Sequence, residues 1–127
     1  MTSNPDERAR CHPGLFDLFE LRTLYAPSQL RELIVRALAQ LDDLQRKLDA
    51  HLAANANRDA VDALHLMAGT ASFFCGSDEV LSALHSAQSA LKSSDAALIR
   101  AALPRARDVL AALTEALSAE LRLGSAS

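Results

Sequence analysis

The chain has no tryptophan, one tyrosine, four glycines and four prolines in 127 residues. An all-β sandwich, or an array of alternating strands and helices, would lack both its strand formers and its turn residues. Alanine (25 residues) and leucine (23 residues) dominate instead, and 50% of the residues are hydrophobic. These proportions predict a single all-α domain that is large enough to bury a core.

The sequence also lacks an excess of positive charge and any long hydrophobic run. Thirteen Lys and Arg against sixteen Asp and Glu give a net charge of −3, which disfavours binding to the phosphate backbone of nucleic acids. Charged residues interrupt the apolar stretches well before the ~20 residues that a membrane span needs. The N-terminal residues have no apolar segment of the secretory type. We therefore expect a cytoplasmic protein that neither binds nucleic acid nor inserts into a membrane.

Recognisable catalytic motifs are absent. The two cysteines, Cys11 and Cys75, lie in unrelated settings and predict neither a disulfide framework nor a metal clip. The sequence contains no His-Glu-x-x-His, no Cys-x-x-Cys, no glycine loop with a phosphate-binding lysine and no Gly-x-Ser-x-Gly. The four histidines are therefore the candidate reactive groups.

Hydrophobic periodicity divides the chain into helices between two irregular ends. Residues 1–14 are polar, without apolar periodicity, and are interpreted as a flexible leader or linker. Residues 15–122 are predicted to form the helical domain, and residues 123–127 a disordered tail. The expected helices cover residues 15–24, 28–54, 58–75, 78–92 and 95–121.

Polar side chains that can accept free backbone N–H groups mark the expected helix starts. These residues are Ser28, Asn57 or Asp59, Ser77, and the run Ser93, Ser94 and Asp95. Pro104 lies inside the last expected helix and, because proline has no backbone N–H, predicts a helix that is kinked or split there. The expected architecture is an antiparallel four-helix bundle with a short extra N-terminal helix.

Three of the histidines have ordinary settings. His12 lies in the leader, His51 at a helix end and His85 beside leucines at an expected core boundary. Structural or incidental roles are the simplest interpretation for these three side chains. His65 differs because of the residues that surround it.

A helix through His65 would bury one apolar stripe. The expected members of this stripe are Ala60, Leu64, Met67, Ala71 and Phe74. His65 lies about 100° from the stripe, towards solvent. Leu66 and Phe73 either pack inward or border a docking patch, whereas Met67 is expected to pack inward.

The face around His65 carries small residues. Asp62 lies one turn before the histidine, Ala68 and Gly69 one turn after it, and Ser72 two turns after it. Glycine inside a helix costs about 1 kcal/mol relative to alanine and offers close approach in return. We interpret the pattern as a histidine presented to a large partner.

This stretch resembles the histidine-containing phosphotransfer (HPt) family. In that family, one helix of a four-helix bundle carries a histidine, an apolar residue at +2, often lysine at +3, glycine at +4 and small residues beyond. His65, Met67, Gly69, Thr70 and Ala71 match this pattern. The chain departs from it in two places, where Ala68 replaces the lysine and Cys75 replaces the glycine usual at +10.

The resemblance implies a phosphorelay intermediate without autonomous catalysis. His65 would accept a phosphoryl group from a receiver-domain aspartate and pass it to another receiver, with Asp62, Leu66, Ala68, Gly69 and Ser72 as the docking surface. The implied partners are response-regulator receiver domains and a sensor histidine kinase. The chain would need no cofactor of its own, because the receiver supplies Mg²⁺. The resemblance also implies an isolated domain that is a monomer, either free-standing or the cytoplasmic C-terminal part of a membrane-bound sensor kinase.

Other interpretations remain open from the sequence. His65 could be a partly buried structural histidine of the bundle. The domain could dock receiver or kinase domains without carrying phosphate, an alternative that Ala68 favours. It could also be a helical oligomerisation domain whose leucine stripes pack against a second copy.

Overall fold

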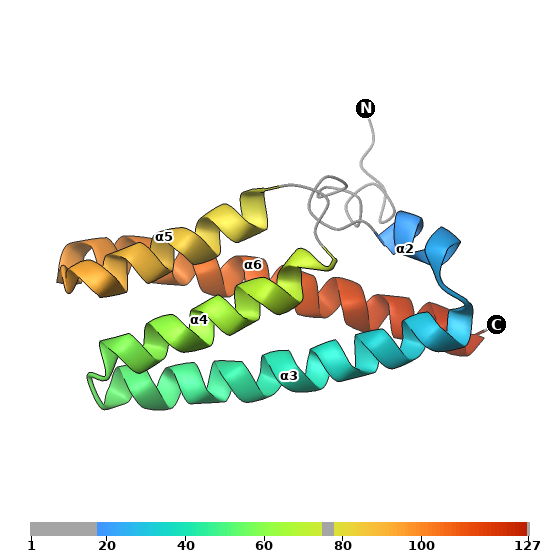
Figure 1. Ribbon diagram of the computed structural model, residues 1–127, viewed down its shortest axis with the longest axis horizontal. Coiled ribbons are helices and arrows are strands. Elements are labelled where there is room, and N and C mark those ends of the chain that lie inside the picture. Colours follow the sequence, from blue (N-terminus) through green and yellow to red (C-terminus); the bar gives the residue numbers. More distant parts are fainter. Residues whose placement is uncertain (1–17, 75–77, 127) are drawn as a thin grey trace.

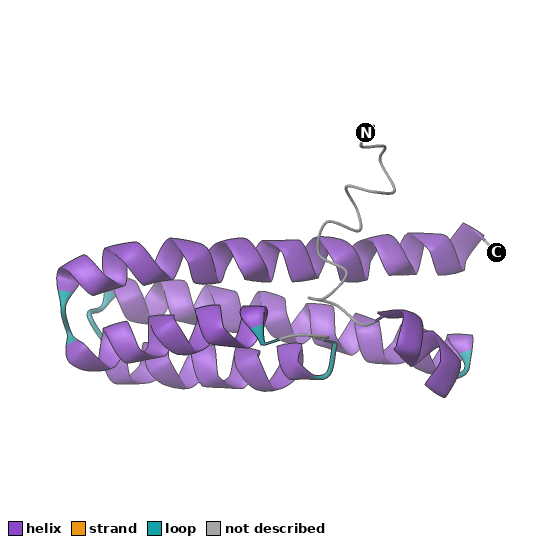
Figure 2. Cartoon of the chain, turned by 90° about the horizontal axis from the view of Figure 1, so that it is seen from above, coloured by secondary structure: helices purple, strands orange, loops and turns teal. Residues whose placement is uncertain are grey.

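A computed structural model describes residues 18–74 and 78–126, although the side chains of Phe19 and of residues 124–126 are not described. The regular structure in this part of the chain is entirely helical (Figure 2), which confirms the all-α prediction. The helices are α2 (Leu18–Leu24), α3 (Pro27–Ala53), α4 (Asn57–Ser72), α5 (Glu79–Ser93) and α6 (Ala96–Ala126). The predictions for residues 1–14, Cys11, His12, Cys75 and Ser77 lie outside the described residues.

The long helices form a bundle in which each contacts two others. α3 packs against α4, α4 against α5, α5 against α6, and α6 against α3. Consecutive long helices run in opposite directions (Figure 1). The short helix α2 contacts α3. None of the described helices is both long enough and apolar enough to span a membrane.

Leucine and alanine stripes fill the centre of the bundle. Helix α3 buries residues at spacings of three and four, namely Leu30, Ile34, Ala37, Leu41, Leu44 and Leu48. Helix α6 contributes Ala106, Leu110, Leu113 and Leu117 to the same core. Burying one leucine-sized side chain stabilises a fold by about 1.5–3 kcal/mol, so these stripes hold the bundle together.

Helix α3 begins one residue earlier than predicted. Ala26 occupies the N-cap position and Pro27 the first turn, where the missing N–H of proline costs nothing. The Ala26 backbone N–H donates to the Gln29 side-chain oxygen at 3.2 Å. The predicted cap at Ser28 is therefore wrong, because Ser28 already lies inside the helix.

The starts of α4 and α6 differ in how they are capped. Ala56 is the N-cap residue of α4 and no side chain caps it, so the caps predicted at Asn57 or Asp59 are also wrong. At α6, the Asp95 carboxylate accepts the backbone N–H groups of Ala97 at 2.9 Å and Leu98 at 3.3 Å. The prediction that Asp95 caps the last helix is confirmed.

Helix α6 passes Pro104 without a break and ends at Ala126. The prediction was a helix either kinked or split at Pro104, and the continuous helix excludes the split. Proline leaves one backbone carbonyl, that of Arg100, without its helical hydrogen-bond partner. The helix extends five residues beyond the predicted end near Leu121.

Candidate functional site

Helix α4 presents His65 on its solvent side. The predicted inward stripe is confirmed, since Ala60, Leu64, Met67, Ala71 and Phe74 are all buried. The opposite side of α4 carries five exposed residues at spacings of four and three, which we call the His65 face: Arg58, Asp62, His65, Gly69 and Ser72. The periodicity of α4 thus separates a reactive side chain from the core that supports it.

Ala68 does not belong to this face. Its side chain is only 6% exposed and is part of the hydrophobic core, so its predicted place on the docking surface is wrong. Helix α4 packs against both α3 and α5, which widens the buried arc until neighbouring pairs such as Met67 and Ala68 are both covered. Alanine suits this position because it allows close packing of the helices.

The His65 imidazole is free among the described residues. It forms no hydrogen bond and no salt bridge within the described part of the chain, and neither does Asp62 one turn earlier. A neutral imidazole of this kind keeps an unshared lone pair on one ring nitrogen. The arrangement therefore offers a nucleophile that the fold itself does not occupy.

Packing against the described residues does not require a glycine at position 69. A Cβ atom built on it would meet nothing within 4 Å beyond the helix's own neighbouring backbone. The Gly69 carbonyl accepts a hydrogen bond from the Ser72 hydroxyl at 2.8 Å, an interaction that any residue at position 69 could make. The bundle would therefore accept a side chain here, and the glycine leaves open space one turn from His65.

An apolar edge borders the His65 face. It consists of Leu66, which is 52% exposed, and Phe73, which is 43% exposed. The Phe73 ring contacts Tyr25, with ring centroids 6.0 Å apart, and stacks edge-on against Phe74 at 5.0 Å. Phe73 thus has a fixed place at the end of α4 while much of it faces solvent, as is typical of a contact surface.

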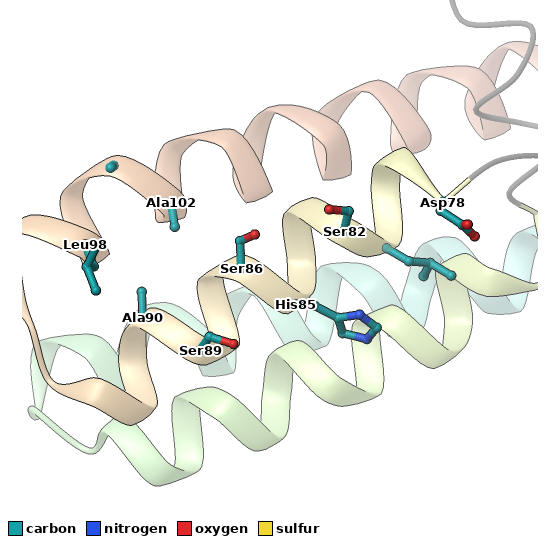
Figure 3. A pocket seen from close by; sticks show the side chains of 10 residues that line it. Asp78, Ser82, His85, Ser86, Ser89, Ala90, Leu98 and Ala102 are labelled. Atoms are coloured by element: carbon teal, nitrogen blue, oxygen red, sulfur yellow. The ribbon is translucent and has the colours of Figure 1, made fainter.

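The other described histidines lie elsewhere. His51 is half-buried in the last turn of α3. His85 is exposed, so its predicted place at a core boundary is wrong. It lines an open groove of about 760 Å³ together with serines of α5 and the first turns of α6 (Figure 3).

Two features of the site could not be read from the sequence motif. Tyr25 precedes α3 and reaches Phe73 only through the tertiary fold. Arg58 stands two turns before His65 on the same face, a spacing visible in the sequence but without meaning until its neighbours are known. The described residues contain no group of three or more His, Cys, Asp and Glu side chains that could hold a metal ion.

Comparison of the chain with known protein families, with curated proteins and with solved structures finds no match.

Proposed function

We propose that this chain is a phosphorelay intermediate of the HPt type, built as an antiparallel four-helix bundle with a short additional helix. His65 accepts a phosphoryl group from the aspartate of one receiver domain and passes it to another. The observation that carries the proposal is an exposed imidazole without a hydrogen-bond or ion-pair partner among the described residues, one turn from a glycine that no contact with those residues requires.

The proposed chemistry consists of two phosphoryl transfers. In the first, a ring nitrogen of His65 attacks the phosphorus of the aspartyl phosphate, and a P–N bond forms as the P–O bond to aspartate breaks. The carboxylate leaves, and the other ring nitrogen releases its proton to solvent. In the second, a carboxylate of the next receiver attacks the phosphorus, the P–N bond breaks and the imidazole regains a proton. Such reactions depend mainly on positioning and charge neutralisation.

The surroundings of His65 suit a large partner better than a small substrate. The imidazole stands on the exposed side of a helix, and Gly69 leaves room beside it. Docking would bury Leu66 and Phe73, which are otherwise exposed. Because Ala68 provides no cation, the receiver's Mg²⁺ and lysine would neutralise the phosphoryl charge. The docking surface then comprises Asp62, Leu66, Gly69 and Ser72, without Ala68.

Labelling of His65 tests this proposal. The chain is incubated with radiolabelled phosphoramidate, a small donor, and separately with phosphorylated receiver domains encoded in the same genome. We expect acid-labile, base-stable label on the unchanged chain and none on His65→Gln. His85→Gln is the matched control, because His85 is also an exposed helical histidine, and it should retain full label.

Label that persists on His65→Gln would contradict the proposal. Receivers that bind the chain while no label reaches His65 from either donor would identify the domain as a binding module that carries no phosphate.

A further inference from the structure

A polar groove adjoins the N-terminal end of the His65 face. It has a volume of about 520 Å³ and lies between the first turns of α4 and the end of α5. Its polar lining consists of Asn57, Arg58, Asp62, Lys92 and Ser94. Arg58 and Asp62 also belong to the His65 face, so the groove and the face form one continuous surface.

The groove holds two cations whose charges are not neutralised by the fold. Arg58 and Lys92 are exposed, and neither forms a salt bridge with any described residue. Arg58 and Asp62 have the spacing of a helical ion pair, yet no salt bridge joins them. Most other described cations are paired, as Arg46 is with Asp42 at 3.1 Å. The groove is therefore locally basic on a chain of net charge −3.

The remaining polar groups leave these cations available. The Asn57 side-chain amide donates to the Leu91 carbonyl at 3.4 Å, so it is already engaged within the groove. Asp62 is the acidic residue of the lining, and its single carboxylate does not balance two cations. An external carboxylate is the complementary group for Arg58 and Lys92.

The position of the groove relative to His65 determines what it can contact. Arg58 precedes His65 by seven residues, which is two turns or about 10 Å along the helix axis. At this separation, the groove would contact a part of the partner's surface that lies to one side of the reacting atoms. It would not contact the phosphoryl group itself. The apolar edge of Leu66 and Phe73 extends towards the opposite end of α4.

We infer that the groove is a second docking point, which receives acidic side chains from the receiver's surface outside its active site. The inference rests on the proposed function. Carboxylates that bind the receiver's Mg²⁺ lie at the phosphoryl group and are neutralised by the metal, so the residues complementary to the groove are other acidic side chains farther out on the receiver's surface. The partner is thereby oriented with acidic residues over Arg58 and Lys92 and apolar residues over Leu66 and Phe73. Attraction between opposite charges raises the rate of association.

Charge reversal at the groove tests this orientation. The variants are Arg58→Glu, Lys92→Glu and the double change, with Arg100→Glu as matched control because Arg100 is an exposed, unpaired cation of α6 among the described residues. Each chain is loaded at His65 with phosphoramidate and mixed with receiver domains from the same genome. The second-order transfer rate is measured at about 50 mM and about 300 mM salt, since the higher concentration shortens the screening length.

We expect the double variant to transfer about tenfold more slowly than the unchanged chain at low salt, with a smaller difference at high salt. Labelling by phosphoramidate should be the same in all variants, because a small donor needs no docking surface. Equal transfer rates for the double variant and the unchanged chain, or an equal loss in Arg100→Glu, would overturn the inference. Failure of phosphoramidate to label His65 would instead refute the proposed function on which the inference rests.

Discussion

Contacts among the described residues do not explain why a glycine, Gly69, lies one turn from His65. A glycine within a helix is unfavourable by about 1 kcal/mol relative to alanine, and apart from the neighbouring backbone of the helix, no atom of the described residues lies within 4 Å of a Cβ built on Gly69. No contact within the described part of the bundle therefore requires this glycine. A partner that approaches His65 closely gains from it, because no Cβ obstructs the approach.

Substitutions at Gly69 should change the stability of the fold and the rate of phosphoryl transfer to a receiver independently of each other. Gly69→Ala should raise the free energy of unfolding by about 0.5–1 kcal/mol, as measured by urea denaturation, because alanine restricts the unfolded chain and favours the helix. Gly69→Leu should remain folded, since its Cβ points into open space, and should still accept phosphate from phosphoramidate. Its transfer to a receiver should fall by at least about tenfold, the equivalent of ~1.4 kcal/mol. Loss of helical circular dichroism in Gly69→Leu would show that position 69 serves packing after all.

Individual helices were predictable where hydrophobic spacing is regular. The expected range 28–54 and the observed α3 (Pro27–Ala53) differ by one residue at each end. The ends were harder to predict, because several polar residues near each start can act as caps. Helix α3 starts at Pro27, because the fixed backbone angle and the missing N–H of proline suit the first turn of a helix.

Ser28 and Asp95 were both predicted to cap a helix, so replacing each of them with alanine gives a matched test of stability. Asp95→Ala should lower the free energy of unfolding by about 1 kcal/mol, because Asp95 accepts two backbone N–H groups at the start of α6. Ser28→Ala should change it by less than about 0.5 kcal/mol, since the Ser28 hydroxyl forms no hydrogen bond with a described residue. Both values are measurable by chemical denaturation, and the reverse order would contradict this assignment of caps.

An ion pair between Arg22 and Glu120 links α2 to α6. Arg22 of α2 donates two hydrogen bonds to the Glu120 carboxylate of α6, one of them at 2.6 Å from its Nε atom. The hydrogen bond to Glu120 raises the pKa of the Arg22 guanidinium above its ordinary value, although burial opposes this shift. The guanidinium therefore stays charged, and the pair ties α2 to the end of the bundle.

At the scale of the whole molecule, the leucine stripes of the helices are buried in the chain's own core. Residues of α3, α4, α5 and α6 form one core. The large hydrophobic side chains that remain exposed among the described residues are Leu24, Val35, Leu66, Phe73, Leu98 and Leu123. They are distributed over several helices, without the continuous stripe that a helical oligomerisation domain requires.

We therefore expect a monomer in solution. Sedimentation velocity across a hundredfold range of concentration should give one species of about 13.6 kDa. A Leu66→Ser, Phe73→Ser double variant should sediment in the same way, because these side chains are assigned to a different partner. Concentration-dependent dimers that this double variant abolishes would show that the apolar edge joins two copies of the chain.

The sequence by itself determined the all-α class, the helix order and the inward stripe of α4, because these follow from spacings of three and four along a helix of 3.6 residues per turn. It also singled out His65 and Gly69. Only the tertiary structure decided that Ala68 is buried and His85 exposed, since the width of a buried arc depends on how many helices pack against it. The same holds for Arg58 and Lys92, which are thirty-four residues apart in the chain. They share a groove only because α4 and α5 pack side by side.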